Sequence, residues 1–232
     1  MKAMVFAAGL GTRLQPLTNT VPKALIRVDG IPLLEQVLTR LIDCEVSEVI
    51  INLHHLPQKI QSFLKLKNNF GIRIELSFEE KLLDTGGGLK QAAWFFDDDE
   101  PFLVHNVDII SNIDLVRMVQ FHAASGGLAT LAVKERQTSR YFIFDQENRL
   151  CGWRSIPQAK EILARRPTGK MVDLAFCGIH VISPRLLTKL TEQGAFSIVD
   201  SYLRLAGQDE KITAFRADEF RWRDVGKLSE VT

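Results

Sequence analysis

Residues 6–13 read Phe-Ala-Ala-Gly-Leu-Gly-Thr-Arg, and this glycine loop follows directly on a short apolar run. The pattern predicts a buried strand that ends in the loop. Glycines lack the Cβ atoms that would keep a phosphate away from the backbone, so main-chain N–H groups can point at its oxygens. Arg13 and Lys23 add positive charge close behind. The stretch therefore predicts a phosphate-binding loop at the end of the first strand.

The loop differs from the two commonest phosphate-binding loops. A dinucleotide fingerprint needs a third small residue where this chain has Leu14, and a P-loop needs Gly-Lys-Ser/Thr, which does not follow here. A Gly-x-Gly pair alone is most often a plain turn. The combination of strand, loop, Arg13 and the rigid Pro22-Lys23 pair favours phosphate binding over that turn.

Size and composition indicate an ordinary globular chain with one domain, residues 1–232. The chain is 46% hydrophobic and 25% charged, and it has a formal net charge of +1. The balanced charge argues against a nucleic-acid partner, and no apolar run is long enough to suggest a membrane partner. We find no secretory signal pattern, and the scattered Cys44, Cys151 and Cys177 form no paired motif. These features predict a cytoplasmic protein.

The first half alternates between strand-like and helix-like segments. Strand patterns cover residues 3–8, 48–53, 72–78 and 102–104, and helical spacing of apolar residues follows Pro32 and recurs around Ile60. Strands separated by helices predict an α/β fold, with a Rossmann-like, mainly parallel sheet flanked by helices.

The pattern changes after about residue 126. Strands are predicted at residues 128–133, 141–144, 149–153, 174–182 and 212–217, and helices at 184–190 and 198–205. Short strands joined by a turn at 145–148 indicate a small antiparallel lobe. We expect two parts within the one domain, about 1–125 and about 126–232.

Polar residues follow several of the predicted strands. Asn52 ends the second strand, and Asn106, Val107 and Asp108 end the strand from Phe102. In an open α/β sheet, ligands bind beyond the carboxyl ends of the strands, where such residues can converge. Polar loops also produce this pattern by chance, so each residue needs its own argument.

Asp108 and Asp224 are the two acids with the clearest chemical potential. Asp108 follows an apolar strand, and a carboxylate in that setting needs a partner. Asp224 is another acid at the end of a strand-like segment, before the turn at Val225-Gly226. Together they would form a two-carboxylate Mg²⁺ site of the kind that phosphoryl and nucleotidyl transfer use. A helix cap or buried hydrogen-bond acceptor is the alternative for Asp108, and the sequence does not establish that the two acids meet.

Thr85-Gly86-Gly87-Gly88 is expected to precede a helix that starts at Leu89. Consecutive glycines cost backbone entropy, so they suggest close approach by a flat ligand or unusual backbone dihedrals. A flexible hinge is the alternative.

These motifs, in this order, resemble the sugar-1-phosphate nucleotidyltransferase family. The resemblance rests on the opening loop, Pro16-Leu17-Thr18, Pro22-Lys23-Ala24-Leu25, Thr85-Gly86-Gly87-Gly88, Asn106-Val107-Asp108, Phe176-Cys177-Gly178-Ile179 and Trp222-Arg223-Asp224-Val225-Gly226. It covers nearly the whole chain. The short length and the last motif look most like the compact branch with N-acetylmuramate-1-phosphate uridylyltransferase and bacterial mannose-1-phosphate guanylyltransferase.

The resemblance implies a role for each matching residue. The implied nucleotide-binding residues are Ala8, Gly9, Gly11, Thr12, Arg13, Lys23, Thr85, Gly86 and Asn106. The implied catalytic residues are Arg13, Lys23, Asp108 and Asp224, of which the two aspartates would hold Mg²⁺. Gly178 would approach the sugar phosphate, and the second part of the chain would be a sugar-binding lobe of the nucleotide-diphospho-sugar transferase fold.

The resemblance also implies a reaction, in which a nucleoside triphosphate and a sugar 1-phosphate give a nucleotide sugar and pyrophosphate. UTP with an N-acetylmuramate or hexosamine-type 1-phosphate, and GTP with mannose 1-phosphate, are the expected pairs. A cytidylyltransferase for a non-sugar phosphate such as phosphocholine, and a non-catalytic nucleotide-binding regulator, are the alternatives. The sequence leaves the oligomeric state open.

Overall fold

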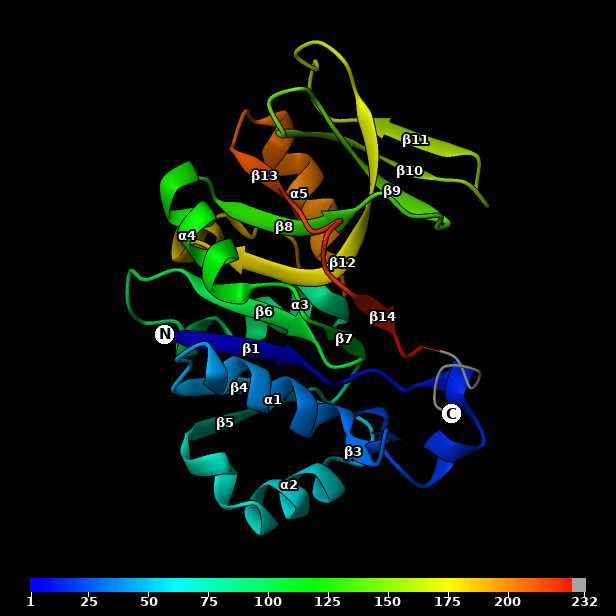
Figure 1. The fold of residues 1–232 in the computed structure, drawn as a ribbon, viewed down its shortest axis with the longest axis vertical. Coiled ribbons are helices and arrows are strands. Elements are labelled where there is room, and N and C mark those ends of the chain that lie inside the picture. The colour runs from blue at the N-terminus through cyan, green and yellow to red at the C-terminus, as the bar shows by residue number, and fades with distance from the viewer. Residues whose placement is uncertain (227–232) are drawn as a thin grey trace.

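A ten-stranded mixed sheet runs the length of the molecule (Figure 1). The computed structural model describes residues 1–226. The strands follow the spatial order β11-β10-β9-β12-β6-β1-β4-β5, and β8 joins β12 to β13. Their bounds are β1 (Lys2–Phe6), β4 (Glu48–Leu53), β5 (Arg73–Phe78), β6 (Phe102–Asn106), β8 (Ala129–Lys134), β9 (Arg140–Phe144), β10 (Leu150–Ser155), β11 (Lys160–Leu163), β12 (Val172–Ile182) and β13 (Ile212–Arg216).

The first half forms the predicted parallel core. Strand β1 lies parallel to β4 on one side and to β6 on the other, and β4 lies parallel to β5. Parallel neighbours require crossover connections. These connections carry the helices α1 (Leu33–Asp43), α2 (Pro57–Leu66) and α3 (Asp84–Gln91). The α/β prediction is confirmed for this half.

The second half is mainly antiparallel. The long strand β12 runs antiparallel to β6, β8 and β9, and β9, β10 and β11 continue as an antiparallel ribbon. Strand β13 lies parallel to β8. Helices α4 (Leu115–Ser125) and α5 (Ile198–Gly207) complete this half. The predicted antiparallel lobe is therefore present, and it continues the same sheet.

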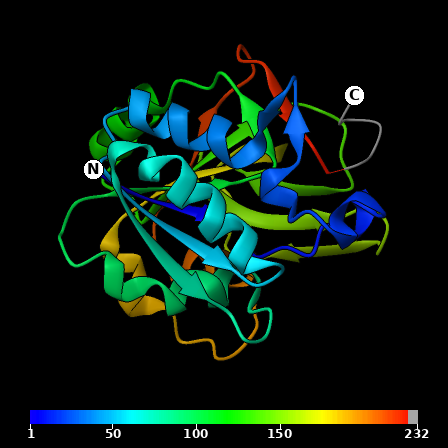
Figure 2. The ribbon, with the colours of Figure 1, turned by 90° about the horizontal axis from the view of Figure 1, so that it is seen from below.

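Apolar residues on both faces of the sheet explain why β1 is an unbroken apolar run. Ala3 and Val5 pack into the core cluster that includes α1, α2 and α4, whereas Met4 packs into the cluster that includes α3 and α5. Figure 2 shows α1 on one side of the strands and α5 on the other. This two-sided burial fixes the register of β1 and the position of the loop that follows it.

Several element predictions need correction. The segment predicted as a helix at 184–190 is a short 3-10 helix, Pro184–Lys189. Helix α4 and edge strand β11 were not predicted. Helix α4 has an Asp114 cap, whose side chain accepts a hydrogen bond from the Arg117 N–H, and ends at Gly126 in the left-handed region.

Two short ribbons lie outside the main sheet. One pairs β2 (Arg27–Val28) with β3 (Ile31–Pro32), and the other pairs β7 (Ile109–Ser111) with β14 (Trp222–Asp224). The second ribbon joins a segment that directly follows the parallel core to the last described strand. It therefore brings the motif that contains Asp224 next to the motif that contains Asp108.

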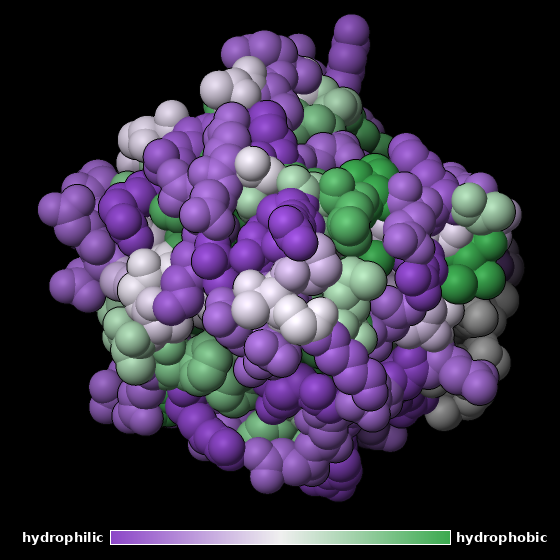
Figure 3. All heavy atoms as spheres, turned by 90° about the horizontal axis from the view of Figure 1, so that it is seen from above, coloured by the Kyte–Doolittle hydropathy of each residue, from purple (hydrophilic) through white to green (hydrophobic). Residues whose placement is uncertain are grey.

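The face seen in Figure 3 is mainly hydrophilic, with separate apolar areas. Within residues 1–226, each helix is too short or too polar to cross a bilayer.

Candidate functional site

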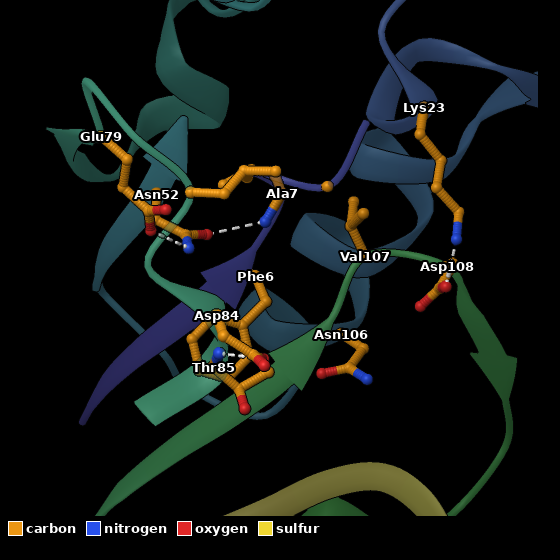
Figure 4. Close-up of a pocket in the computed structure, with 13 residues that line it drawn as sticks. Phe6, Ala7, Lys23, Asn52, Glu79, Asp84, Thr85, Asn106, Val107 and Asp108 are labelled. Carbon is orange, nitrogen blue, oxygen red and sulfur yellow. Dashed lines mark hydrogen bonds and ion pairs between the residues drawn. The ribbon is translucent and has the colours of Figure 1, made fainter. Parts of the chain in front are cut away.

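The carboxyl ends of three parallel strands meet at one edge of the sheet. Phe6, the last residue of β1, is aligned with Asn52 of β4 and with Asn106 of β6. A pocket of about 430 Å³ opens at this edge (Figure 4). It is lined by Phe6, Ala7, Ala8, Gly9, Lys23, Asn52, Glu79, Leu82, Asp84, Thr85, Asn106, Val107 and Asp108. The strand ends thus form the kind of crevice in which α/β proteins bind ligands.

A buried hydrogen-bond network forms one wall of the pocket. The Asn52 side chain accepts a hydrogen bond from the Ala7 N–H at 2.8 Å and donates one to Glu79 Oε1 at 2.7 Å (Figure 4). The other Glu79 oxygen accepts from the Leu83 N–H at 2.9 Å. Both side chains are buried. The network therefore ties the start of the glycine loop to the residue that precedes α3.

Glu79 is a pocket residue that the sequence analysis missed. It directly follows β5, which ends at the same edge as β1, β4 and β6. The signal that could have identified Glu79 is the one used for Asn52, a polar residue at the end of a predicted strand.

The two glycines of the loop occupy different environments. Gly11 has φ +65°, and a Cβ atom there would lie 2.7 Å from Thr18 Cγ2, so the fold requires glycine at this position. At Gly9, no atom of the described residues lies within 4 Å of an added Cβ, and φ is outside the left-handed region. Gly9 also lines the pocket. The fold itself therefore does not require glycine at position 9, and the backbone there is accessible to a ligand.

The two predicted acids lie side by side. Asp108 follows β6, and Asp224 ends β14 opposite Ile109 of β7. The Val225 N–H donates to the Asp108 carbonyl at 2.8 Å, which holds the two segments together. Lys23 forms an ion pair with Asp108, and their side chains are only 11% and 18% exposed. Lys23 and both acids therefore belong to one cluster at the pocket edge.

The surroundings of Asp224 disfavour the charged form of its carboxyl group. Burial raises the pKa of its carboxyl group and the neighbouring Asp108 raises it further, against the opposing charges of Lys23, Arg13 and Arg136. Its Oδ1 atom is buried and has no hydrogen-bond partner among the described residues. Buried carboxylate oxygens are normally satisfied, so Oδ1 is an acceptor for which the described residues supply no partner.

The donor set fits Mg²⁺ better than a closed metal cage. Across residues 1–226, no group of three or more His, Cys, Asp or Glu side chains is arranged to hold a metal ion. Mg²⁺ commonly takes one or two carboxylates and completes its coordination with waters and substrate phosphates. Asp108 and Asp224 supply that number.

Six of the predicted site residues line the pocket, and the others lie around it. The six are Ala8, Gly9, Lys23, Thr85, Asn106 and Asp108. Arg13 approaches Gly226 and acts on Asp224 electrostatically. Gly11 and Thr12 belong to the loop outside the lining, and Thr12 begins a three-residue 3-10 turn.

The glycine run at 86–88 has a different role from the one predicted. All three glycines lie inside α3, which begins at Asp84, and do not precede a helix from Leu89. Added Cβ atoms would meet the Phe196 ring at 2.3 Å, the Gly194 carbonyl at 2.5 Å and the Glu79 carboxylate at 2.7 Å. The glycines therefore allow α3 to pack closely on its protein neighbours. Gly86 itself is buried against Phe196 and outside the pocket lining.

Thr85 and Gly178 connect the pocket to the second half of the chain. Thr85 Oγ1 accepts a hydrogen bond from the N–H of Ile198, the first residue of α5. Gly178 lies in β12 with φ +73°, at an interruption in the pairing of β12 with β8. A Cβ atom there would lie 2.8 Å from Ile109 and 2.9 Å from the Asn106 amide nitrogen. Only glycine allows β12 to approach the site this closely.

The model of the nucleotidyl transferase family matches residues 2–232. The chain belongs to this family. As a family member it is 28% identical to a UTP–glucose-1-phosphate uridylyltransferase of Synechocystis over 99% of the chain. It is also 28% identical to a mannose-1-phosphate guanyltransferase of Hypocrea jecorina over 98% of the chain. The chain spans 61% of the length of each of these two relatives.

Solved structures share the fold of this nucleotidyl transferase family member. A UDP-glucose pyrophosphorylase from Acinetobacter baumanii superposes with a TM-score of 0.78 at 17% sequence identity, covering 99% of this chain and 90% of that one. The likeness confirms the predicted fold class.

Proposed function

We propose that this protein transfers a nucleotidyl group from a nucleoside triphosphate to a sugar 1-phosphate, giving a nucleotide sugar and pyrophosphate. The observation that carries the proposal is the convergence of Lys23, Asp108 and Asp224 beside the open backbone of Gly9. Family membership gives this cluster its chemical context. The relatives' names support UTP or GTP as the donor and a hexose 1-phosphate as the acceptor.

In this proposal the two parts of the chain have separate tasks. Residues of about 1–125 bind the nucleoside triphosphate, with the triphosphate along Gly9, Gly11, Thr12 and Arg13 and the base near Thr85, which lines the pocket. Residues of about 126–232 bind the acceptor, which Gly178 admits close to Asn106. Two observations support the division: the described residues that line the pocket all fall within residues 6–108, and Gly178 of the second part lies against Asn106 at the pocket.

The reaction requires little covalent chemistry from the protein. An oxygen of the sugar phosphate attacks the α-phosphorus in line, a new P–O bond forms, and the bond to the β-phosphate oxygen breaks as pyrophosphate leaves. The protein aligns two anions and screens their repulsion. Lys23, which is paired with Asp108, would donate to the phosphate oxygens, and Arg13 would add further positive charge.

Asp108 and Asp224 would hold Mg²⁺, which supplies neutralisation of phosphate charge when bound. The buried, unpartnered Oδ1 atom of Asp224 supports this assignment. An acid pair held by a β-ribbon and a lysine would keep its spacing in the absence of substrate, so little reorganisation would accompany binding.

A pyrophosphate-release panel tests the proposal. The protein is incubated with Mg²⁺, each of ATP, CTP, GTP and UTP, and each of a set of acceptors: several hexose and N-acetylhexosamine 1-phosphates and phosphocholine. We expect pyrophosphate with one donor and a sugar 1-phosphate. Release with phosphocholine alone would assign a non-sugar acceptor, and nucleotide binding without release for any acceptor would assign a regulatory protein.

Lys23→Ala is the companion variant in this panel. We expect it to lower turnover about 10²-fold while the protein stays folded, because it removes a cation next to the transferred phosphate. Lys65→Ala, on the exposed surface of α2, is the matched control. Full turnover by a folded Lys23→Ala protein would contradict the assigned role.

A further inference from the structure

The strand that carries Asp224 has little support from the sheet. Strand β14 has three residues and pairs with β7, which is equally short. Trp222 and Asp224 are two residues apart on β14, so their side chains lie on the same face of the strand. Contacts that fix the position of Trp222 therefore also restrict the position of Asp224.

Trp222 is held both on its ring face and on its ring edge. The Arg136 guanidinium lies over the indole, with Cζ 4.0 Å from the ring centroid. The indole N–H donates a hydrogen bond to the Cys177 carbonyl at 2.8 Å. Arg136 in turn donates from Nη2 to the Phe176 carbonyl at 2.9 Å. The Arg136–Trp222 clamp thus fixes β14 to β12 immediately before Gly178.

The chemistry of Arg136 suits a positioning role. It follows β8 and is half-buried, and it makes no ion pair with any acid in the described part of the chain. Its charge is therefore not neutralised by an ion-pair partner, and it interacts electrostatically with Asp224. A planar guanidinium can stack on an indole and donate hydrogen bonds at its edge at once, which a lysine cannot do.

The geometry points to Arg136 and Trp222 as positioning residues that hold Asp224 against Asp108 and so set the affinity for the divalent cation. The inference rests on the proposed function, because it assumes that the two acids share a cation. It also couples the acceptor side to the cation site, since both hydrogen bonds of the clamp end on the β12 residues before Gly178.

Cation binding without turnover tests the clamp. Mn²⁺ alone is titrated into the full chain, and free Mn²⁺ is followed by its electron paramagnetic resonance signal. We expect Arg136→Met to weaken Mn²⁺ binding at least about fivefold, because both the stack and the bond to the Phe176 carbonyl are lost. We expect Arg136→Lys to weaken it about threefold, because an ammonium group keeps a cation over the indole but lacks the planar guanidinium that also reaches that carbonyl. Trp222→Phe, which loses the bond to Cys177, is expected to fall between wild type and Arg136→Met.

Two further variants separate the possible outcomes. Arg140→Met removes an exposed arginine four residues further along the chain and is expected to bind Mn²⁺ like wild type. Asp224→Asn is expected to abolish the binding. If Asp224→Asn loses Mn²⁺ but Arg136→Met and Arg136→Lys do not, the clamp inference is overturned and the proposed cation site survives. If Asp224→Asn binds Mn²⁺ normally, the proposed cation site itself fails, and the inference fails with it.

Folding is checked in parallel by circular dichroism and thermal unfolding. If Arg136→Met does not fold, Arg136→Lys carries the test, and wild-type Mn²⁺ affinity in that variant overturns the inference.

Discussion

Asp145, which is buried in the antiparallel lobe, and Asp224, which is half-buried at the pocket edge, have opposite environments. Asp145 accepts hydrogen bonds from the backbone N–H groups of Glu147 and Arg149 on one oxygen and from Arg165 and the Thr168 N–H on the other. Asp224 has an oxygen with no partner among the described residues. The first carboxylate is fully satisfied by the protein, and the second keeps one oxygen for which the described residues supply no donor.

The pKa shifts of the two carboxyl groups follow the same division. Burial acts to raise the pKa of Asp145, but Arg165 and the surrounding N–H groups outweigh it, and the pKa is lowered. For Asp224, burial is reinforced by Asp108, and the pKa is raised. A satisfied buried acid stabilises the fold, whereas an acid with an unsatisfied oxygen at a pocket is a candidate for a functional residue.

Asp224→Asn should give the largest effect. If Asp224 holds the cation, turnover should fall about 10³-fold, roughly 4 kcal/mol of transition-state stabilisation. The free energy of unfolding should be unchanged or rise by up to about 1 kcal/mol, because a poorly compensated buried charge is removed. Pyrophosphate release and urea unfolding measure the two quantities. A variant that is destabilised yet fully active would reverse the comparison.

Asp145→Asn should show the opposite pattern. The variant leaves Arg165 without its carboxylate in a site where the Asp145 side chain is 0% exposed, so we expect a loss of about 3 kcal/mol in the free energy of unfolding. Turnover at a temperature where the variant is folded should remain close to wild type. Urea unfolding and pyrophosphate release again provide the measurements, and a large loss of turnover in the folded variant would connect the lobe to catalysis.

The sequence predicted the first half of the fold more completely than the second. Residues 48–53 were predicted as a strand with the bounds that β4 has, because a parallel strand buried on both faces is a continuous apolar run. Edge strand β11 has the sequence Lys-Glu-Ile-Leu, is mainly exposed and, among the described strands, pairs with β10 alone, so no apolar period marks it. Helix α4 could have been predicted from Asp114 and Gly126 at its ends.

The site was predictable where single strand ends create it and unpredictable where distant segments meet. Asn52, Asn106 and Asp108 follow from the strand pattern, and the structure brings them together. The adjacency of Asp108 and Asp224 depends on the short pairing of β14 with β7, for which neither segment has a sequence signal. The stack of Arg136 on Trp222 is likewise a purely tertiary contact. Packing of this kind is absent from local periodicity.

Acid pH should reveal a third class of buried group, the neutral histidines of the sheet. Burial lowers the pKa of His180 to about 3, helped by the nearby His105, and burial lowers that of His105 to about 4. The unfolded chain binds these protons near pH 6.5, so stability is fully present above that pH and is lost as the pH falls toward 4. We expect the two histidines to lower the free energy of unfolding by about 2 kcal/mol between pH 7 and pH 5.5.

Urea unfolding at a series of pH values measures this loss. His180→Asn removes one of the two groups, so its unfolding free energy should fall less steeply with decreasing pH than that of wild type. Equal slopes would place the acid sensitivity elsewhere. Asp224, with its raised pKa, changes stability in the opposite sense, since its protonation favours the folded state.

Gly9→Ala tests the comparison at the level of a single methyl group. The fold leaves room for a side chain at Gly9, and its φ suits alanine, so the unfolding free energy should be unchanged or slightly raised. Nucleotide affinity, measured by calorimetric titration with UTP and GTP, should fall about tenfold if the methyl group occupies the path of a phosphate.

Gly11→Ala is the matched control for the fold, because φ +65° and the contact with Thr18 should make it destabilising by about 1–3 kcal/mol. If Gly9→Ala binds nucleotide like wild type, the open backbone at the pocket has no role in phosphate binding. The charge of Lys23 and Arg13 would then have to account for phosphate binding without it.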